Sequence, residues 1–305
     1  MHPTIAASFP DVDSVVVMQR GDLLFEHYKP GTDANTLHDV QSVTKSVLAL
    51  LVGIALERGA LKSLDQAVAT LLPTAALQDA DTTYPPVTIR HLLTMTAGFE
   101  PAGRFSRADA DNPQFLMQRP RRAAPGTTFE YDNLAANLLS IALEAATGQA
   151  TSSFAREGLF EPMGITAFEW ARGRHRHTVG FSGLSLRTRD MARLGQLVLQ
   201  QGAWQGRQLL PREFTAAAVQ PHNAGGPPAG LAYGYLWWVG PASSPKRTFL
   251  ASGYGGQFIW VYPPMDLVVA TTSAVSETSQ SRAQALTLIR NDIFRAVTAA
   301  VGPSR

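Results

Sequence analysis

The chain has 305 residues, of which 45% are hydrophobic and 16% charged, and its formal net charge is +2. The low charge content excludes a disordered or polyelectrolyte chain, and the length allows a sizeable buried core in one large domain or two. The near-neutral balance and the lack of a long basic run argue against a nucleic-acid partner, while the absence of cysteine excludes thiol catalysis, zinc–thiolate sites and disulfides.

The N-terminal residues MHPTIAASFPDVDS lack a basic segment followed by an apolar one, so no signal peptide is visible. The longest apolar run, at 47–56, has about half the length that a membrane-spanning helix needs. We therefore expect a soluble protein without a membrane span. A cytoplasmic location is favoured, a periplasmic one stays open for a processed chain, and the oligomeric state is not predicted.

The first strands are predicted to form a hairpin, with residues 14–19 and 23–28 on either side of a turn at 20–22. After Ser42 the sequence VTKSVLALLVGIALERG predicts a helix that ends at Gly59. Because this helix is apolar almost all round, we expect it to be central and buried.

From about residue 65 to 180 the sequence predicts helices and long loops with few strands. An amphipathic helix is expected over 131–147, ending at Gly148. Another helix is expected over 191–201, with Thr188 as its N-cap and Gly202 as its stop.

The C-terminal part returns to strands and closes with a helix: the predicted ranges are 248–252, 257–262, 267–272 and the helix 281–299. Strands at both ends with helices between them predict an α+β fold, in which one antiparallel sheet is built from both chain ends and flanked by helices. We expect a single catalytic domain over 1–305, with a mostly helical subdomain at about 65–180 inserted between the sheet-forming ends.

The first candidate catalytic residue is Lys45, because it is one of only four lysines against 22 arginines and opens the most apolar helix. Burial lowers the pKa of a lysine toward neutrality and leaves an amine that accepts a proton. Ser42 precedes it by three residues, so the two share a helix face, and the helix N-terminus offers free N–H groups to an oxyanion. The alternative interpretation is an N-capping Ser42 beside a Lys45 that extends to solvent; the motif is weak alone.

Two later segments strengthen the catalytic interpretation. Tyr131-Asp132-Asn133 forms a YxN motif just before a helix, and residues 249–254 form a strand of small residues followed by Gly255 and Gly256. Small side chains there would let a substrate backbone lie along the strand edge.

Other common motifs are missing, including a phosphate-binding loop, HExxH and GxSxG. The glycines at 253–256 follow a strand but precede no helix, so they are not a dinucleotide site. His175 and His177 lie in an arginine-rich stretch that we interpret as a solvated loop rather than a metal site.

The order of SxxK, YxN and a small-Ser-Gly strand resembles the serine β-lactamase and penicillin-binding protein superfamily. It is most similar to the class C-type branch, which includes class C β-lactamases, family VIII esterases, D-amino-acid peptidases and 6-aminohexanoate-dimer hydrolases. The resemblance extends over about residues 12–298, with further matching stretches at 90–98, 187–195 and 233–238.

The resemblance implies Ser42 as the acyl nucleophile, Lys45 as its proton acceptor and Tyr131 as the general base or its relay, with a cationic Lys45 stabilising a tyrosinate. Asn133 would hold the substrate carbonyl or amide, and the strand at Ser252, Gly253 and Tyr254 would bind substrate. The backbone N–H groups of Ser42 and Tyr254 would form the oxyanion hole. No metal and no organic cofactor is expected.

Two departures bear on the substrate. Lactam-specialised members have lysine or histidine where this chain has Ala251, so the expected carboxylate-binding cation is missing unless Lys246 or Arg247 replaces it. Met95 replaces a common histidine, with unknown consequence.

Several aromatic residues of the C-terminal half could either line the site or pack in the core. Among them we expect Tyr254 to form a wall of the site, and those between 233 and 238 to pack in the core.

The sequence therefore predicts a serine hydrolase that cleaves esters or amides of small substrates, more esterase-like than lactam-hydrolysing. The alternatives are a β-lactamase, a D-amino-acid peptidase, or a catalytically quiet penicillin-recognising scaffold. Either enzyme would form an acyl-enzyme on Ser42, whereas a scaffold would form none.

Overall fold

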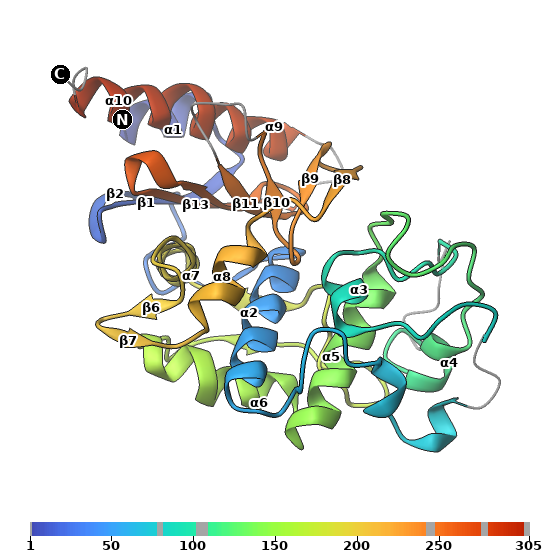
Figure 1. Cartoon of the computed structure of the whole chain (residues 1–305). Helices are drawn as coiled ribbons and strands as arrows, with labels where there is room; N and C mark the ends of the chain where they lie inside the picture. The colour runs from blue at the N-terminus through green and yellow to red at the C-terminus, as the bar shows by residue number, and fades with distance from the viewer. Residues whose placement is uncertain (1, 78–81, 102–108, 242–247, 276–279, 302–305) are drawn as a thin grey trace.

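The computed structural model describes residues 2–77, 82–101, 109–241, 248–275 and 280–301 (Figure 1). Its largest sheet has eight antiparallel strands in the order β2-β1-β13-β12-β11-β10-β9-β8. The strands are β1 (Val12–Gln19), β2 (Asp22–Tyr28), β8 (Asn223–Gly226), β9 (Leu231–Tyr233), β10 (Trp238–Val239), β11 (Phe249–Gly253), β12 (Gln257–Tyr262) and β13 (Leu267–Ser273).

The two ends of the chain meet inside this sheet, because β1 pairs along its length with β13. The predicted hairpin is confirmed: β1 and β2 are joined at Arg20 and Gly21, whose φ angles of 54° and 90° suit a two-residue hairpin turn. The three predicted C-terminal strands are also confirmed, each within one residue. The expected sheet built from both chain ends is therefore present.

Helices cover both faces of the sheet (Figure 1). On one face lie α1 (His2–Ser8), α9 (Gln280–Thr287) and α10 (Phe294–Val301). A π-helical stretch, η6 (Leu288–Ile293), joins α9 to α10, so the predicted C-terminal helix is one continuous helical segment with a widened middle. On the other face lie α2 (Val43–Glu57), α7 (Thr188–Leu199) and α8 (Arg212–Ala218).

Helix α7 starts earlier than predicted. Thr188 is its first residue and Arg187 occupies the N-cap position, so the prediction of Thr188 as N-cap is wrong. The Thr188 hydroxyl is instead hydrogen-bonded to Ser14 Oγ of β1, at 2.5 Å between the two oxygens. A tertiary contact with the sheet therefore replaces the local cap.

Helix α5 (Asn133–Thr147) is more buried than predicted. It begins after Asp132, ends at the left-handed Gly148 as expected, and buries every residue from 134 to 143. The expected amphipathic pattern is wrong for this part, because α5 contacts α2, α3 (Ile89–Leu93), α4 (Pro113–Met117) and α6 (Thr151–Ala155). Helix α5 is thus a second central helix beside α2.

Smaller elements complete the chain. A three-stranded sheet has the order β3-β5-β4, and a hairpin joins β6 to β7. Their bounds, with those of the short helical turns, are β3 (His38–Asp39), β4 (Glu169–Trp170), β5 (Leu184–Leu186), β6 (Ala203–Trp204), β7 (Arg207–Gln208), η1 (Val68–Thr70), η2 (Thr74–Leu77), η3 (Arg156–Phe160), η4 (Glu161–Met163) and η5 (Pro263–Met265). A separate helical subdomain at about 65–180 stays a prediction.

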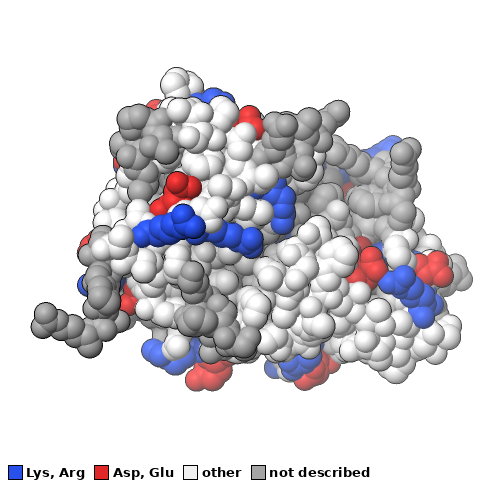
Figure 2. Space-filling view, turned by 90° about the horizontal axis from the view of Figure 1, so that it is seen from above, with Lys and Arg blue, Asp and Glu red and all other residues white. Residues whose placement is uncertain are grey.

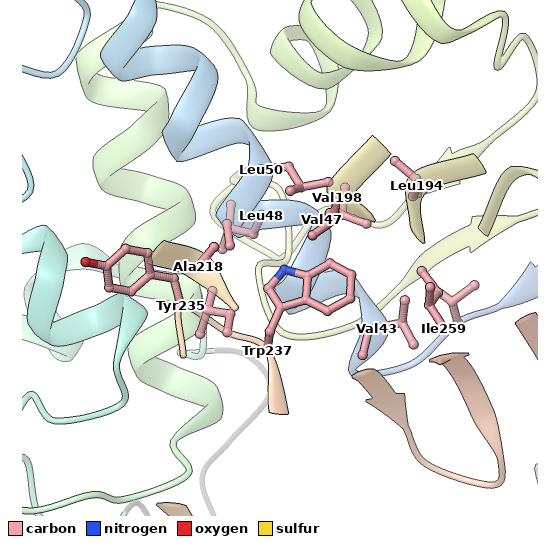
Figure 3. Close-up of a cluster of buried hydrophobic side chains, with 14 of the residues drawn as sticks. Val43, Val47, Leu48, Leu50, Leu194, Val198, Ala218, Tyr235, Trp237 and Ile259 are labelled. Atoms are coloured by element: carbon pink, nitrogen blue, oxygen red, sulfur yellow. The ribbon is translucent and has the colours of Figure 1, made fainter. Parts of the chain in front are cut away.

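The core is one cluster that joins the central helices to the sheet. Figure 3 shows part of it, where Trp237 lies among side chains of α2, α7 and β12. The predicted central, buried helix is confirmed, since every residue of α2 from Val43 to Ala55 is buried. Nevertheless, none of the described helices is both long and apolar enough to span a bilayer.

The outer surface on the side of α1, α9 and α10 is mostly uncharged (Figure 2). On this face the lysine and arginine side chains lie in small groups, and some of these groups adjoin acidic side chains. This face therefore shows small, separate groups of positive and negative side chains rather than one large charged patch.

Close packing of α7 on the sheet gives a first prediction. A Cβ at Gly195 would lie 2.6 Å from Val268 Cγ1 and 2.7 Å from Ile259 Cγ2. Alanine is favoured over glycine in an exposed helix by about 1 kcal/mol, but overpacking costs about 1–3 kcal/mol. We therefore expect Gly195→Ala to lower the melting temperature.

Calorimetry of the purified variant measures this effect. The control is Gly226→Ala, whose Cβ would meet its nearest atom, Phe129 Cδ1, at 3.5 Å. A Gly195→Ala variant as stable as the parent would show that α7 does not pack this closely on β12 and β13.

Candidate active site

The hydroxyl of Ser42 stands at the start of α2 without serving as a helix cap. Ser42 occupies the N-cap position, but its side chain accepts no capping hydrogen bond from the helix. Its Oγ instead accepts a hydrogen bond from Lys45 Nζ at 3.0 Å. The alternative interpretation of Ser42 as a structural cap is therefore wrong.

A tight turn sets the position of Ser42. Gln41, just before it, has φ 52°, which a non-glycine residue adopts only at a cost. Both oxygens of Asp39 hold this turn, accepting hydrogen bonds from Gln41 N at 2.9 Å and Gln41 Nε2 at 2.8 Å. The turn aims the start of α2 toward the end of β11.

Gly253 lets β11 approach this turn. A Cβ on Gly253 would lie 2.4 Å from the carbonyl oxygen of Val40 and 3.1 Å from Gln41 Cβ. In the described sheet, β10 pairs only with Phe249 and Leu250, so the edge of β11 beyond Leu250 has no strand partner there. This part of β11 is buried, and its use by a substrate backbone remains a prediction.

Lys45 is buried rather than extended to solvent, with 1% of its surface exposed. Besides Ser42 Oγ, its Nζ donates to the carbonyl oxygen of Phe181 at 3.0 Å and lies 4.8 Å from the centre of the Tyr131 ring. Burial lowers the pKa of Lys45 to about 7, although the carboxylate of Asp132 acts in the opposite direction. Near neutral pH, Lys45 is thus present in both protonation states.

Burial raises the pKa of Tyr131 to about 12, although the Ser42 hydroxyl and the charge of Arg282 act in the opposite direction. Its ring stacks on Trp238, with 5.6 Å between centroids, and meets Tyr233 edge-on at 6.3 Å. The aromatic side chains between residues 233 and 238 are buried in the core, as expected. Two of them, Tyr233 and Trp238, also hold the Tyr131 ring in place. The directions of the pKa shifts favour neutral Tyr131 beside a titrating Lys45, not the expected tyrosinate.

A buried ion pair holds the YxN segment. Asp132 Oδ1 accepts from Leu134 N at 2.8 Å and so caps α5, while its Oδ2 accepts from Arg119 Nη1 at 2.7 Å. Arg119 and Asp132 are only 6% and 8% exposed. The backbone N–H of Asp132 donates to Met95 Sδ at 3.4 Å, which gives the unusual Met95 a supporting position.

Asn133 follows this cap as the first residue of α5. Its Oδ1 is buried, and no described residue donates a hydrogen bond to it. A buried acceptor without a donor is costly, so this oxygen is suited to an N–H group of a ligand.

Arg282 is a cation that the sequence analysis missed. Its Nη1 donates to Ser252 Oγ at 3.2 Å, and its charge also acts on Tyr131. It forms no ion pair with any described carboxylate. No motif marks Arg282, since it lies on α9 and meets Ser252 of β11 only through the folding of the C-terminal segment.

The other positions considered as sources of a cation are Ala251, Lys246 and Arg247. Ala251 is fully buried within β11, and Lys246 and Arg247 lie outside the described residues. Tyr254, at the end of the same segment, is 52% exposed, so its role as a wall of the site remains a prediction. The oxyanion hole formed by the N–H groups of Ser42 and Tyr254 is likewise still a prediction.

The arginine-rich loop contains no metal-like cluster. His177 Nδ1 lies 2.6 Å from Glu144 Oε2, and this contact raises the pKa of His177. Within the described ranges, no group of three or more His, Asp or Glu side chains is placed to hold a metal ion.

Known proteins are similar to this chain in sequence and in fold. The profile of the β-lactamase family matches residues 10–292. Esterase EstB of Burkholderia gladioli is 31% identical over 176 residues, which cover 49% of this chain and 44% of EstB. The 6-aminohexanoate-dimer hydrolase of Paenarthrobacter ureafaciens is 23% identical over 304 residues, covering 86% of this chain and 72% of that protein.

Among solved structures, a protein described as a candidate 6-aminohexanoate-dimer hydrolase from Bacillus anthracis is similar with a TM-score of 0.81. It is 21% identical, and the alignment covers 99% of this chain and 82% of that one. The penicillin-binding protein homologue of Pyrococcus abyssi aligns with a TM-score of 0.74 at 19% identity, covering 94% and 75%. These likenesses show a β-lactamase/transpeptidase-like fold, and the family match over most of the sequence shows that the chain belongs to the β-lactamase family.

Proposed function

We propose that the protein is a serine hydrolase that cleaves ester or amide bonds of small substrates through an acyl-enzyme on Ser42. The observation that carries this proposal is a buried amine whose pKa is about 7, placed 3.0 Å from a serine hydroxyl at a helix N-terminus. A serine hydroxyl is a weak nucleophile unless a nearby base takes its proton, and neutral Lys45 is such a base.

In acylation, neutral Lys45 accepts the proton of Ser42 as Oγ bonds to the substrate carbonyl carbon. The negative charge on the carbonyl oxygen is stabilised by the proposed N–H groups of Ser42 and Tyr254. Neutral Tyr131 donates its proton to the leaving oxygen or nitrogen and is reprotonated from Lys45. In deacylation, neutral Lys45 accepts a proton from a water molecule as the water oxygen bonds to the acyl carbon. The bond from that carbon to Ser42 Oγ then breaks, Tyr131 protonates Oγ and is reprotonated from Lys45, and the acid product leaves.

The names of the relatives favour esters and small amides as substrates. One is an esterase and another hydrolyses the dimer of 6-aminohexanoate. Short-chain esters are the first substrates to test, because an ester leaving group needs less protonation than an amine.

Lactam hydrolysis is a second candidate, and Arg282 is the observation that favours it. The expectation against lactams depended on a site without a cation, whereas Arg282 places a guanidinium at Ser252. Comparing kcat/KM for 4-nitrophenyl butyrate and nitrocefin separates the two candidates, and we expect the ester to be the better substrate. A better turnover of nitrocefin would make lactam hydrolysis the principal activity.

The nucleophile is tested with Ser42→Ala. Because this change removes one hydroxyl that caps nothing, we expect an unchanged melting temperature and a complete loss of labelling by a fluorophosphonate. Intact-mass spectrometry measures the adduct on both proteins. An adduct that persists in Ser42→Ala would place the nucleophile elsewhere, and the lack of an adduct or turnover in the parent would favour the catalytically quiet scaffold.

Lys45→Arg distinguishes a proton acceptor from a fixed positive charge. Arginine keeps the charge but remains protonated at all accessible pH values. We expect Lys45→Arg to lose about 100-fold or more in kcat/KM, as Lys45→Ala does, which is typical of removing a general base. Recovery of more than about a tenth of the parent activity by Lys45→Arg would contradict proton transfer, provided that thermal melts show a folded protein.

Asp132 provides a test of pH dependence. Its carboxylate raises the pKa of Lys45, so Asp132→Asn should lower that pKa further. Activity needs neutral Lys45, so kcat/KM should rise with pH through a pKa near 7 in the parent. In the variant this rise should occur at lower pH.

The ion pair complicates the stability of Asp132→Asn and calls for a matched double variant. Leaving Arg119 buried without its partner costs about 3–5 kcal/mol, while removing both charges is often close to neutral. We expect Arg119→Met/Asp132→Asn to recover stability and keep the shifted pH profile. A profile that returns to the parent's in the stable double variant would show that Asp132 acts only through folding.

A further inference from the structure

A cavity of about 430 Å³ adjoins the proposed nucleophile and is not used in the mechanism above. One side of its wall includes Gln41, next to Ser42, and Phe181, whose carbonyl oxygen accepts the Lys45 hydrogen bond. Because Gln41 directly precedes Ser42 in the chain, we expect one end of a substrate bound covalently to Ser42 to reach this cavity. The cavity therefore bears on which substrates the site accepts.

Much of the wall belongs to a loop, residues 171–183, which includes Phe181 and also brings Arg172 and Arg174 to the cavity. Both side chains are exposed, and neither forms an ion pair with any carboxylate in the described part of the chain. Six other arginines are paired with a carboxylate, namely Arg90, Arg119, Arg122, Arg187, Arg189 and Arg193. Two unpaired guanidinium groups thus remain at the cavity.

The loop that carries them is held firmly. Buried Asp111 accepts from the backbone N–H groups of His175 at 2.9 Å and His177 at 3.3 Å. Gly173 lies so close that a Cβ there would be 2.1 Å from Asp111 Cγ. Glu144 holds the other end, accepting from Thr178 N at 3.0 Å and contacting the His177 ring. Two arginines on a fixed backbone are a preorganised arrangement, unlike those of a loose surface loop.

Of the two carboxylates in the cavity wall, Asp39 is bound through both oxygens, whereas buried Asp111 is bound through Oδ2 and its Oδ1 accepts no hydrogen bond from a described residue. Asp39 binds the backbone and side chain of Gln41, and Asp111 binds the loop backbone. Asp111 is 1% exposed, whereas Arg172 and Arg174 are exposed, so the guanidinium groups are the positive charges of the wall that a ligand can reach. Guanidinium matches the geometry of a carboxylate.

We propose that Arg172 and Arg174 make this cavity a subsite for an anionic end of the substrate, so that the enzyme prefers esters or amides that carry a carboxylate a few bonds from the scissile group. This inference rests on the proposed hydrolase function. The proposed subsite lies on the 171–183 loop, whereas Arg282 lies on α9.

Three esters with the same leaving group and a six-carbon acyl chain test the proposal: the 4-nitrophenyl esters of adipate, hexanoate and 6-aminohexanoate, whose free ends are negative, neutral and positive. Exposed ion pairs are individually weak, so we expect kcat/KM to favour the adipate ester over the hexanoate ester by about five- to tenfold. The 6-aminohexanoate ester should be the poorest, and 0.5 M salt should reduce the preference for adipate.

Variants assign the preference to residues. In Arg172→Gln/Arg174→Gln, the ratio of adipate to hexanoate should fall to within about twofold of one. Arg176→Gln is the matched control, since Arg176 is an exposed arginine of the same loop that does not line the cavity. We expect this control to keep the parent ratio.

Several outcomes would overturn the proposal: equal rates for adipate and hexanoate, a preference for the cationic ester, or an adipate preference that survives the double variant. The last outcome together with its loss in Arg282→Gln would assign the preference to Arg282.

Binding to Ser42→Ala provides a readout that needs no turnover. Saturation-transfer NMR should show methyl hydrogen adipate binding more tightly than methyl hexanoate, and equal binding would also overturn the subsite. If the parent hydrolyses no ester but Ser42→Ala retains the anion preference, the hydrolase proposal fails and the subsite stands.

Discussion

The burial of one ammonium group is the constraint on which the candidate site depends. Lys45 lies in α2, where every residue from Val43 to Ala55 is buried, and 1% of its own surface is exposed. The cost of placing a charge there lowers the pKa of Lys45 to about 7. The same burial raises the pKa of Tyr131 to about 12. One apolar environment thus lowers the pKa of the lysine and raises that of the tyrosine, which suits the base and acid roles proposed for them.

The sheet is what brings the remaining groups to Lys45. Because β1 pairs with β13, the N-terminal and C-terminal segments form one sheet, whose strand β11 contacts α2. Arg282 of α9 joins the site through its hydrogen bond to Ser252 in β11. Strand β11 comes close to the turn before α2 because Gly253 has no side chain. In that turn Gln41 has a positive φ angle, and Asp39 holds it there by hydrogen bonds. The positions of Ser252 and Arg282 therefore depend on contacts between residues far apart in the sequence.

Local patterns explain which features could be predicted. The β1–β2 hairpin, the buried α2 and the C-terminal strands follow from turn residues and apolar runs, and the spacing of Ser42 and Lys45 follows from helix geometry. Burial around α5 depends on four neighbouring helices, and the hydroxyl of Thr188 bonds to a strand 174 residues earlier in the chain. Arg282 escaped notice because its relation to Ser252 exists only in three dimensions. The expectation of a site without a cation, which was based on Ala251, was therefore incomplete, because Arg282 lies at Ser252.

The protonation of Lys45 can be measured directly, because the chain has only four lysines. Labelling lysine with ¹³C at Cε gives four resonances, and Lys45→Arg identifies the one that belongs to Lys45. NMR titration from about pH 5 to 11 should show this resonance changing with a pKa near 7, whereas an ordinary lysine titrates near 10.4. If the Lys45 resonance titrates above about 9.5 in the folded protein, Lys45 is a permanent cation at neutral pH. It could not then be the base that activates Ser42.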